Sequence, residues 1–385
     1  MPPRWLRRKF ALYGAVMTEA DARADTRFMT LALALGRRGL GNTWPNPAVG
    51  AVAVRDGVIV GRGWTQPGGR PHAEVVALRQ AGDSARGSTL YVTLEPCSHH
   101  GKSPPCADTI LVAGVARVVS AMEDPNPEVS GQGHARLRAA GVVVDLGLGA
   151  EEARRAHAGH ISRVVRHRPH VTLKLAVSAD RKAGLAGRKP IAITGEVANT
   201  RVHAMRAQHD AILVGIGTAL ADDPLLTCRL PGMAHLSPVR VVLDRALRLP
   251  LTGRLVRSAR TTPLLILSGS DAPLIAETGL RTEGAEVLRT DARNGGLDLA
   301  DVLTQLNGRG ISRLLVEGGP TVAAAFLNAD LIDAAVLLRA PLAIGPDGID
   351  ALEGLRLEAL TASPRYAVRD SQTLGLDTMT TYERA

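Results

Sequence analysis

Three potential metal ligands and one carboxylate place the strongest constraint on how the N-terminal half of this chain can fold. His72 provides an imidazole, Cys97 and Cys106 provide thiols, and Glu74 stands close behind the histidine. A structural zinc site is usually closed by four protein ligands, whereas a catalytic site keeps three and leaves one position for water. Thiolate and imidazole favour zinc over hard cations, although they are also compatible with iron. The fold must therefore gather three separate segments around one metal ion.

Chance occurrence is the alternative, since isolated histidines and cysteines usually pack in a core or lie on the surface. Here, however, two of the three cysteines of the chain fall within residues 97–106, downstream of a histidine that begins an apolar-periodic stretch. A His-x-Glu pattern followed by Pro-Cys is typical of zinc-dependent deaminases, in which the metal ionises a water molecule and the glutamate carries its proton. The pattern predicts hydrolytic loss of ammonia from a heterocyclic ring, with Glu74 as the catalytic residue.

The length of the chain, 385 residues, suits two domains of ordinary size. No run of about 18 apolar residues occurs, so no membrane span is expected. With two cysteines assigned to a metal, only Cys228 is left, which argues against a disulfide framework and for a reducing compartment. We therefore expect a cytoplasmic protein.

The formal net charge of +9 raises the alternative of a nucleic-acid partner. Part of this charge, however, lies in Arg4, Arg7, Arg8 and Lys9, ahead of the first acidic residue. Aromatic residues make up only 3% of the chain, which disfavours base-stacking surfaces. A modest positive charge suits small phosphorylated substrates equally well. Residues 1–16 fit either a targeting peptide or a misassigned start, and we prefer the second interpretation, with Met17 as the initiator.

Strands alternate with helices in the N-terminal half. The first helical spacing begins near Asp25, with Asp25 or Thr26 as its cap, and the turn residues Asp56-Gly57 join the first two strands. The expected helices cover residues 25–38, 72–81, 105–113, a stretch near 133–139, and 151–168, where Pro169 ends the last one. The expected strands cover residues 48–54, 58–64, 89–94, 115–122 and 142–144. Such alternation predicts an α/β layer sandwich.

A second α/β pattern begins after Pro169. Its apolar strands are expected at residues 171–177, 211–214, 239–243, 264–267, 313–316 and 334–338. We therefore place a domain boundary at this proline. The chain is expected to consist of an N-terminal extension at 1–24, a first domain at 25–168 and a second domain at 169–385.

Four segments of the first domain carry a recognisable combination of residues. They are Pro45-Asn46-Pro47-Ala48-Val49-Gly50, Pro71-His72-Ala73-Glu74, residues 95–106, and Asp124-Pro125-Asn126-Pro127. This combination resembles the bifunctional deaminase/reductase family of riboflavin biosynthesis. The long loop between the cysteines is the discriminating point, because nucleoside and nucleic-acid deaminases generally have Cys-x-x-Cys there. The resemblance, from about Asp25 to the C-terminus, implies a cytidine-deaminase-like three-layer sandwich followed by a dihydrofolate-reductase-like α/β domain.

The resemblance also implies roles for single residues of the first domain. Zinc would lie on His72, Cys97 and Cys106, with Glu74 as the proton shuttle. Asn46 would orient the ring, and the ribose phosphate end would be held by Lys102, Asp124 and Asn126. The alternative for these last four residues is a purely local role in turns and loops. Thr65 departs from the family, which usually has a histidine at this position.

In the second domain, residues 214–218, 221–229 and 316–321 look like the reductase half of the same family, which uses NADPH. A lone Gly-x-Gly would be weak evidence for a nucleotide-binding site. At Gly318-Gly319-Pro320-Thr321, however, a strand is expected to end in glycines and a helix to begin, and such a helix N-terminus suits a phosphate. The resemblance implies cofactor contacts from Ala176, Ala192, Thr218, Asp222, Arg245, Gly319, Pro320 and Thr321. It implies substrate contacts from Lys174, Pro190, Arg206, Leu226, Arg229 and Glu317.

Alternatives and departures accompany these assignments. Asp222 could simply cap a turn, and Arg206 could be a solvated helix residue. For Lys174 and Asp180, a place beside the reacting sugar and a purely local role are equally open. Pro190 and Ala192 stand where many family members have serine and tryptophan, so that a polar contact and an aromatic contact are replaced.

The sequence thus predicts an enzyme that acts twice in succession on a phosphorylated pyrimidine. The first domain would hydrolyse the 2-amino group of a diamino-ribosylaminopyrimidinone phosphate, and the second would reduce the ribose of the product to a ribityl group. We expect a homo-oligomer without nucleic-acid or membrane partners. Two alternatives are a deaminase with an inactive or repurposed reductase half and a nucleic-acid-binding module with structural zinc.

Overall fold

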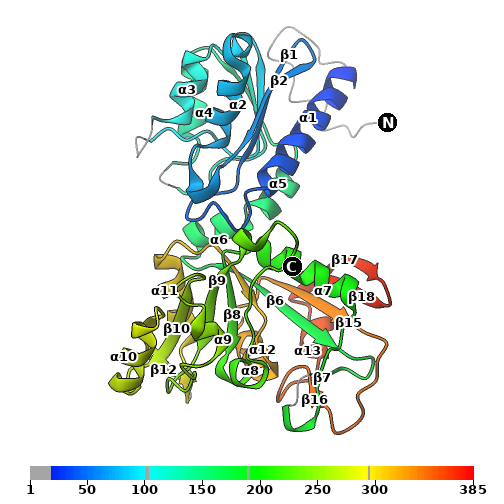
Figure 1. The fold of residues 1–385 in the computed structure, drawn as a ribbon. Helices are drawn as coiled ribbons and strands as arrows, with labels where there is room; N and C mark the ends of the chain where they lie inside the picture. Colours follow the sequence, from blue (N-terminus) through cyan, green and yellow to red (C-terminus); the bar gives the residue numbers. More distant parts are fainter. Residues whose placement is uncertain (1–18, 100–103, 128, 189–190, 294) are drawn as a thin grey trace. The chain divides into compact units, whose positions relative to one another are not determined.

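The computed structural model describes residues 19–99, 104–127, 129–188, 191–293 and 295–385. The chain divides into two compact units (Figure 1). The first unit contains residues up to Gly39 together with Asn46–His157, and the second contains Leu40–Pro45 together with Ala158–Ala385. In the described part of the chain, no helix is long and apolar enough to cross a membrane.

The first unit is built on a five-stranded sheet. Its strands are β1 (Gly50–Arg55), β2 (Val58–Trp64), β3 (Thr89–Val92), β4 (Arg117–Ser120) and β5 (Val143–Leu146), in the order β2-β1-β3-β4-β5. β1 runs antiparallel to β2 and β3, whereas β3, β4 and β5 are parallel. Asp56 and Gly57 both have positive φ, as the tight turn between β1 and β2 requires.

Helices cover both faces of this sheet. One face carries α1 (Glu19–Arg37) and α5 (Ala150–Ala156), and the other carries α2 (Ala73–Ala81), α3 (Cys106–Val112) and α4 (Gln132–Ala139). Gly61 and Gly63 of β2 let α2 approach closely, since a Cβ at either position would lie within 2.4 Å of a carbonyl oxygen of α2. The predicted three-layer sandwich is thereby confirmed.

Two helix predictions in the first half of the chain are wrong in detail. α1 begins at Glu19, so Asp25 is an interior residue and not a cap. Its carboxylate is buried and instead pairs with Arg117 of β4 and accepts a hydrogen bond from Tyr91 of β3. The expected helix at 151–168 is two helices, α5 and α6 (Ala158–Val165). The break falls at His157, whose buried ring contacts the carbonyl and hydroxyl oxygens of Thr93.

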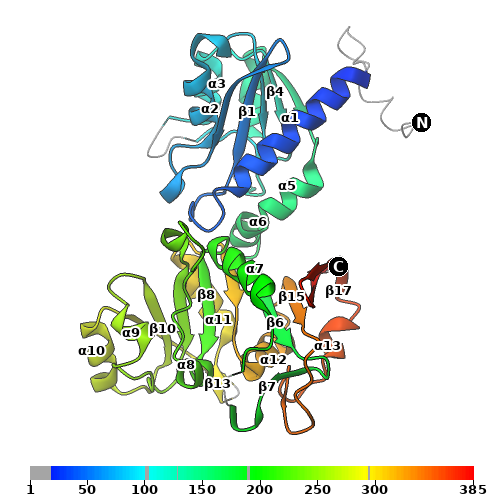
Figure 2. The same ribbon diagram turned by 45° about the vertical axis from the view of Figure 1, so that its right-hand side comes forward.

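The second unit is built on a nine-stranded sheet. Its strands are β6 (His170–Val177), β8 (Ala211–Gly215), β9 (Val239–Leu243), β10 (Leu264–Gly269), β11 (Glu286–Thr290), β14 (Arg313–Val316), β15 (Ala334–Arg339), β17 (Tyr366–Leu374) and β18 (Asp377–Arg384). The order is β11-β10-β9-β8-β14-β6-β15-β18-β17, and Figure 2 labels β10, β8, β6, β15 and β17 of this sheet. The strands from β11 to β15 are parallel, and the C-terminal hairpin β17–β18 is antiparallel. All six predicted strands are confirmed.

Helices cover both faces of the second sheet as well. One face is covered by α7 (Glu196–Ala207), α8 (Ile216–Asp222), α9 (Arg254–Arg257) and α10 (Leu274–Thr282). The other is covered by α11 (Leu299–Gly308), α12 (Pro320–Asn328) and α13 (Glu358–Thr361). Two small ribbons, β7 (Lys182–Gly184) with β16 (Ile349–Asp350) and β12 (Ala292–Arg293) with β13 (Gly296–Leu297), lie outside the main sheet.

The strand order reverses direction within this sheet. From β6 the chain crosses through α7 to β8 and continues outward to β9, β10 and β11, and it then returns to insert β14 between β8 and β6. In an open parallel sheet, such a reversal leaves a crevice at the carboxyl ends of the strands, which is where ligands bind. The topology therefore places a binding site at the ends of β6, β8 and β14.

Candidate active sites

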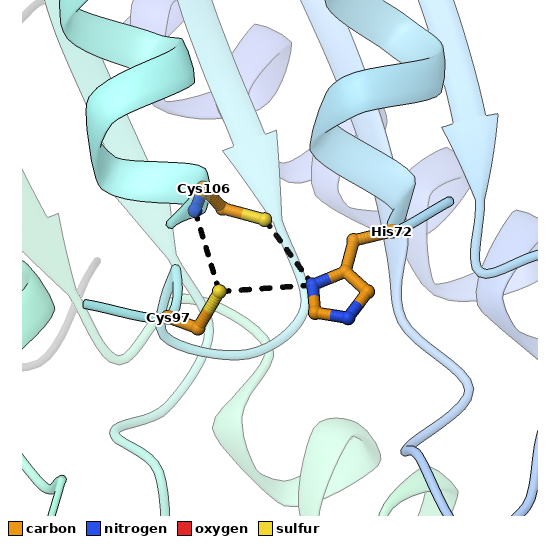
Figure 3. A group of neighbouring side chains, drawn as sticks. All are labelled: His72, Cys97 and Cys106. Atoms are coloured by element: carbon orange, nitrogen blue, oxygen red, sulfur yellow. Dashed lines mark hydrogen bonds between the residues drawn. The ribbon is translucent and has the colours of Figure 1, made fainter. Parts of the chain in front are cut away.

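The first candidate site is the group of His72, Cys97 and Cys106, which the structure brings together as predicted (Figure 3). His72 caps the N-terminus of α2, Cys97 lies in the loop after β3, and Cys106 is the first residue of α3. The Nδ1 atom of His72 lies 3.2 Å from Sγ of Cys106 and 3.7 Å from Sγ of Cys97. The backbone N–H of Cys106 donates to Sγ of Cys97 at 3.3 Å.

These three residues fit zinc. Their ligand atoms all lie within 4.8 Å of one another, and the group comprises these three residues in the part of the chain that the structure describes. A hydrogen bond from Cys106 lowers the pKa of the Cys97 thiol to about 4, although burial opposes this shift. The pKa of the Cys106 thiol is raised, mainly by its hydrogen bond to Cys97 and secondly by burial. A metal ion bound by both sulfurs would displace the proton of the Cys106 thiol.

Glu74 lies in the first turn of α2, beside the ligand group, and is only 4% exposed. Burial raises the pKa of its carboxyl, and the nearby charge of His72 opposes this shift only in part. A carboxyl group with a raised pKa takes up a proton more readily than an ordinary carboxyl group and can release it again. This is the property that a proton shuttle needs.

The other predicted residues of the first unit lie in structured loops. Nδ2 of Asn46 donates to the carbonyl oxygen of Gly69 at 2.9 Å. Oδ1 of Asp124 accepts a hydrogen bond from the backbone N–H of Asn126 at 2.9 Å. The buried hydroxyl of Thr65 accepts from the backbone N–H of Val49, so it serves the start of β1. Lys102 lies outside the described residues.

Sequence reasoning missed Glu95, a buried carboxylate that precedes the Cys97 loop. Its two oxygens accept four hydrogen bonds, all from backbone N–H groups of residues 124–134. An acidic residue directly before Pro96-Cys97, at the end of an apolar strand, was the available signal. The residues that receive its bonds are remote in sequence and could not be inferred from it.

The second candidate site is a cavity of about 660 Å³ at the ends of β6, β8 and β14. Ligand pockets commonly have volumes of this order. The predicted residues that line it are Lys174, Ala176, Ala192, Arg206, Thr218, Asp222, Leu226, Arg229, Glu317, Gly319 and Pro320. Pro190 lies outside the described residues, so the structure does not place it.

A compact group of charges occupies one wall of this cavity. The carboxylate of Glu317 accepts from Nε and Nη2 of Arg206 at 2.8 and 2.9 Å, and Nζ of Lys174 lies 4.0 Å away. Burial opposes ionisation of Glu317, but the hydrogen bonds and charge of Arg206 outweigh it and lower the pKa of this carboxyl. For Lys174, burial itself lowers the pKa, because it disfavours the charged amine. The alternative of a solvated Arg206 is wrong, because only 12% of its side chain is exposed.

Three predicted residues of the second unit contact other parts of the structure. Arg245 donates to the carbonyl oxygen of Gly295 and lies 3.3 Å from a carboxylate oxygen of Asp271. The hydroxyl of Thr321 donates to Glu353. The carboxylate of Asp180 accepts from the backbone N–H groups of Ile344 and Gly345, so it ties two loops together. None of the three is among the described residues that line the cavity.

Two family models of known proteins match the sequence of this chain, one in each half. The cytidine and deoxycytidylate deaminase zinc-binding region matches residues 22–122, and the RibD C-terminal domain matches residues 169–379. The fold and the sites therefore define a class of protein in which a deaminase-type zinc domain is joined to a RibD-type C-terminal domain.

Curated relatives and solved structures identify the family. The chain is 41% identical over 366 residues to riboflavin biosynthesis protein RibD of Escherichia coli, covering 92% of this chain and 97% of the relative. It is 38% identical over 364 residues to the protein of the same name from Aquifex aeolicus, covering 94% and 98%. The structure of Acinetobacter baumannii RibD, form 1, superposes with a TM-score of 0.84 at 34% identity over 94% of this chain and 99% of that one. The chain belongs to the RibD family, which confirms the resemblance seen in its motifs.

A Thermotoga maritima structure adds a chemical description to the family. It is a diaminohydroxyphosphoribosylaminopyrimidine deaminase/5-amino-6-(5-phosphoribosylamino)uracil reductase and superposes with a TM-score of 0.81 at 34% identity. The match covers 94% of this chain and 99% of that chain, so both units are included.

Proposed function

We propose that this chain deaminates a diamino-ribosylaminopyrimidinone phosphate in its first unit and reduces the ribosyl group of the product to ribityl, with NADPH, in its second. The observation that carries the proposal is the group of His72, Cys97 and Cys106 beside the buried Glu74. Three ligands with one carboxylate in reserve are the pattern of a catalytic zinc site and not of a structural one. Membership of the RibD family supports the pairing of this site with a reductase.

In the deaminase site, zinc on His72, Cys97 and Cys106 would supply an ionised water as nucleophile at neutral pH. Glu74 would take the proton of this water, because its buried carboxyl has a raised pKa. The same carboxyl would give this proton to the ring nitrogen, and it would then carry a second proton, from the hydroxyl added to the ring carbon, to the departing amine. Asn46 would orient the ring, and Asp124 and Asn126, together with Lys102, would hold the ribose phosphate end.

In the reductase site, NADPH would supply a hydride to the sugar carbon. The first turn of α12, with Gly319 and Pro320, offers backbone amides and a helix dipole to a cofactor phosphate. Thr218 accepts the backbone N–H of Gly319 at 3.0 Å and so joins the two glycine-containing motifs. The substrate would lie against Lys174, Glu317 and Arg206. Arg229, which also lines the cavity, would contribute a positive charge for the substrate phosphate.

A two-part assay tests the proposal. The purified chain is given the pyrimidine phosphate, and ammonia release and NADPH oxidation are followed separately; the deaminated product is then supplied directly. We expect ammonia from the first substrate without NADPH, and NADPH oxidation with the second substrate without further ammonia. Ammonia release with no oxidation of NADPH or NADH by either route would leave the deaminase-only alternative in place.

Partners and location complete the proposal. The chain would work on a small phosphorylated pyrimidine as a cytoplasmic homo-oligomer, without nucleic acid. A nucleic-acid-binding module with structural zinc is the competing class. It would show an affinity for RNA or DNA that falls steeply with salt concentration, whereas we expect no binding at physiological salt.

A further inference from the structure

Glu95 stands out among the buried groups that the proposed chemistry does not use. It lies between β3 and Cys97 and is 6% exposed. Oε2 accepts from the backbone N–H groups of Asp124 at 3.0 Å and Gly131 at 2.9 Å. Oε1 accepts from those of Gly133 at 2.8 Å and His134 at 3.3 Å. A carboxylate is costly to bury unless it is fully hydrogen-bonded. Here both oxygens accept backbone N–H groups that are distant in sequence, and Oε2 also lies 3.9 Å from Nδ1 of the buried His134.

The hydrogen bonds continue from Glu95 to the expected substrate residues. Glu95 fixes the backbone of Asp124, and Oδ1 of Asp124 in turn accepts the backbone N–H of Asn126 at 2.9 Å. In the other direction, only Pro96 separates Glu95 from Cys97, and its fixed φ limits the freedom of this connection. One carboxylate therefore links a metal ligand to both described residues that are expected to hold the ribose phosphate end.

Close packing at Gly133 independently indicates that this arrangement is fixed. A Cβ at Gly133 would lie 2.0 Å from the carbonyl oxygen of Pro96 and 3.2 Å from Cγ of Glu95. Real Cβ contacts do not reach the first of these distances, so the first turn of α4 touches the Cys97 loop directly. The loop and α4 can keep this spacing only with glycine at position 133.

We propose that Glu95 is a positioning residue of the deaminase, which sets the distance between the zinc ligands and the phosphate end of the substrate. The inference rests on the proposed function. Glu95 acts through Asp124 and Asn126 and touches no reacting atom. Its loss should therefore weaken recognition of the phosphorylated end more than it slows the chemical step.

The test is Glu95→Gln, which keeps the shape of the side chain but replaces one acceptor oxygen by a donor, so that two of the four bonds are lost. Deaminase kcat and KM are measured with the pyrimidine 5′-phosphate and with the corresponding nucleoside, together with zinc content and NADPH oxidation by the deaminated product. We expect KM for the phosphate to rise about thirtyfold, since two charge-assisted hydrogen bonds are lost. The kcat for the phosphate, the nucleoside reaction, zinc content and reductase rate should each stay within about threefold, because none of them depends on residues 124–126.

Two further variants keep the test decisive. Glu123→Gln makes the same chemical change one residue before Asp124 on a side chain that is 47% exposed, and it should leave KM unchanged. If the glutamine variant fails to fold, Glu95→Asp takes its place in the test. This variant keeps both acceptor oxygens and should give a smaller rise in KM. An unchanged KM in Glu95→Gln, an equal loss for phosphate and nucleoside, or a loss of zinc would each overturn the inference. Failure of the proposed function itself would appear separately, as absence of ammonia release by the wild-type chain.

Discussion

The two active sites place their reacting groups in different ways. In the first unit, three side chains from separate segments converge within a few ångströms, so the identity of each residue decides whether the site exists. In the second unit, the site is a cavity of about 660 Å³ that results from the strand order, and charged side chains share its lining with glycine, alanine and larger apolar residues. The difference teaches that a metal site can be recognised from residue types and spacing, whereas a sheet-end cavity must be recognised from topology.

Buried carboxylates also serve different purposes in the two sites. Burial raises the pKa of Glu74, and the nearby charge of His72 opposes this shift only in part. Glu317 is held by Arg206 and approached by Lys174, so its pKa is lowered. The first carboxyl is suited to exchange a proton, and the second is suited to remain charged and to fix its neighbours.

The largest change in activity is expected from Glu74→Gln, which tests the difference between the two buried carboxylates. The variant keeps the volume of the side chain but cannot carry a proton, so ammonia release should fall about a thousandfold. Zinc content and NADPH oxidation with the deaminated product should be unchanged. Metal analysis and the two separate assays measure this, with Glu151→Gln, 77% exposed, as the matched control. Full deamination by Glu74→Gln, or loss of its zinc, would contradict the assignment.

The reciprocal effect is expected from Glu317→Gln. This change leaves Arg206 and Lys174 without their countercharge, so the groups facing the sugar lose their fixed positions, and reductase kcat should fall about a hundredfold. Deamination should stay at the wild-type rate, because the two sites lie in separate units. Steady-state assays of both reactions measure this, and Glu286→Gln, with 47% of its side chain exposed, is the control. Loss of both activities would break the separation between the sites.

Much of the fold could be predicted from the sequence because strand and helix periodicities are strong in both halves. All six strands expected in the second half lie where apolar runs occur. Prediction missed β11, β17 and β18 of the nine-stranded sheet, since β11 has only two consecutive apolar residues, and the exposed β17 alternates weakly and has few apolar residues. The cap assigned to Asp25 failed for a different reason, because its charge partner Arg117 lies on a remote strand. The domain boundary at Pro169 stays a prediction.

The candidate sites divide in the same way. His72, Cys97 and Cys106 could be grouped from the sequence because few residue types bind zinc. The roles assigned to the reductase residues came from the resemblance, and no spacing rule would have joined Arg206 to Glu317. The place of Glu95 directly before Pro96-Cys97 was a signal, but its role could not be inferred, because its partners are remote backbone groups that carry no signature in the sequence.

A smaller effect, on stability alone, is expected from Arg117→Ala. Arg117 binds Asp25 through two hydrogen bonds and Asp145 through a third, and it joins α1 to the sheet. Its removal leaves the buried Asp25 without a countercharge and should lower the free energy of unfolding of the first unit by about 2 kcal/mol, less than for a fully buried pair because 27% of Arg117 is exposed. Thermal and urea denaturation measure this, with Arg23→Ala, 78% exposed, as the control. A loss of reductase stability to the same extent would show that the units do not unfold separately.

The smallest effect is expected from Ala192→Trp, which introduces the aromatic residue that the family resemblance implies at this position. Ala192 is exposed and lines the cavity, in which no described residue is aromatic, so the cofactor has no ring to stack on. An added indole should contribute about 1 kcal/mol by stacking, which lowers KM for NADPH about fivefold. KM for the substrate and deaminase activity should not change, because neither depends on this wall. Ala329→Trp is the control for a general effect of added apolar surface. Ala329 is exposed and lies at the end of α12 that is far from the cavity. A change of KM for the substrate but not for NADPH would assign position 192 to the substrate. The cofactor would then contact α12 and Thr218, without a contact from position 192.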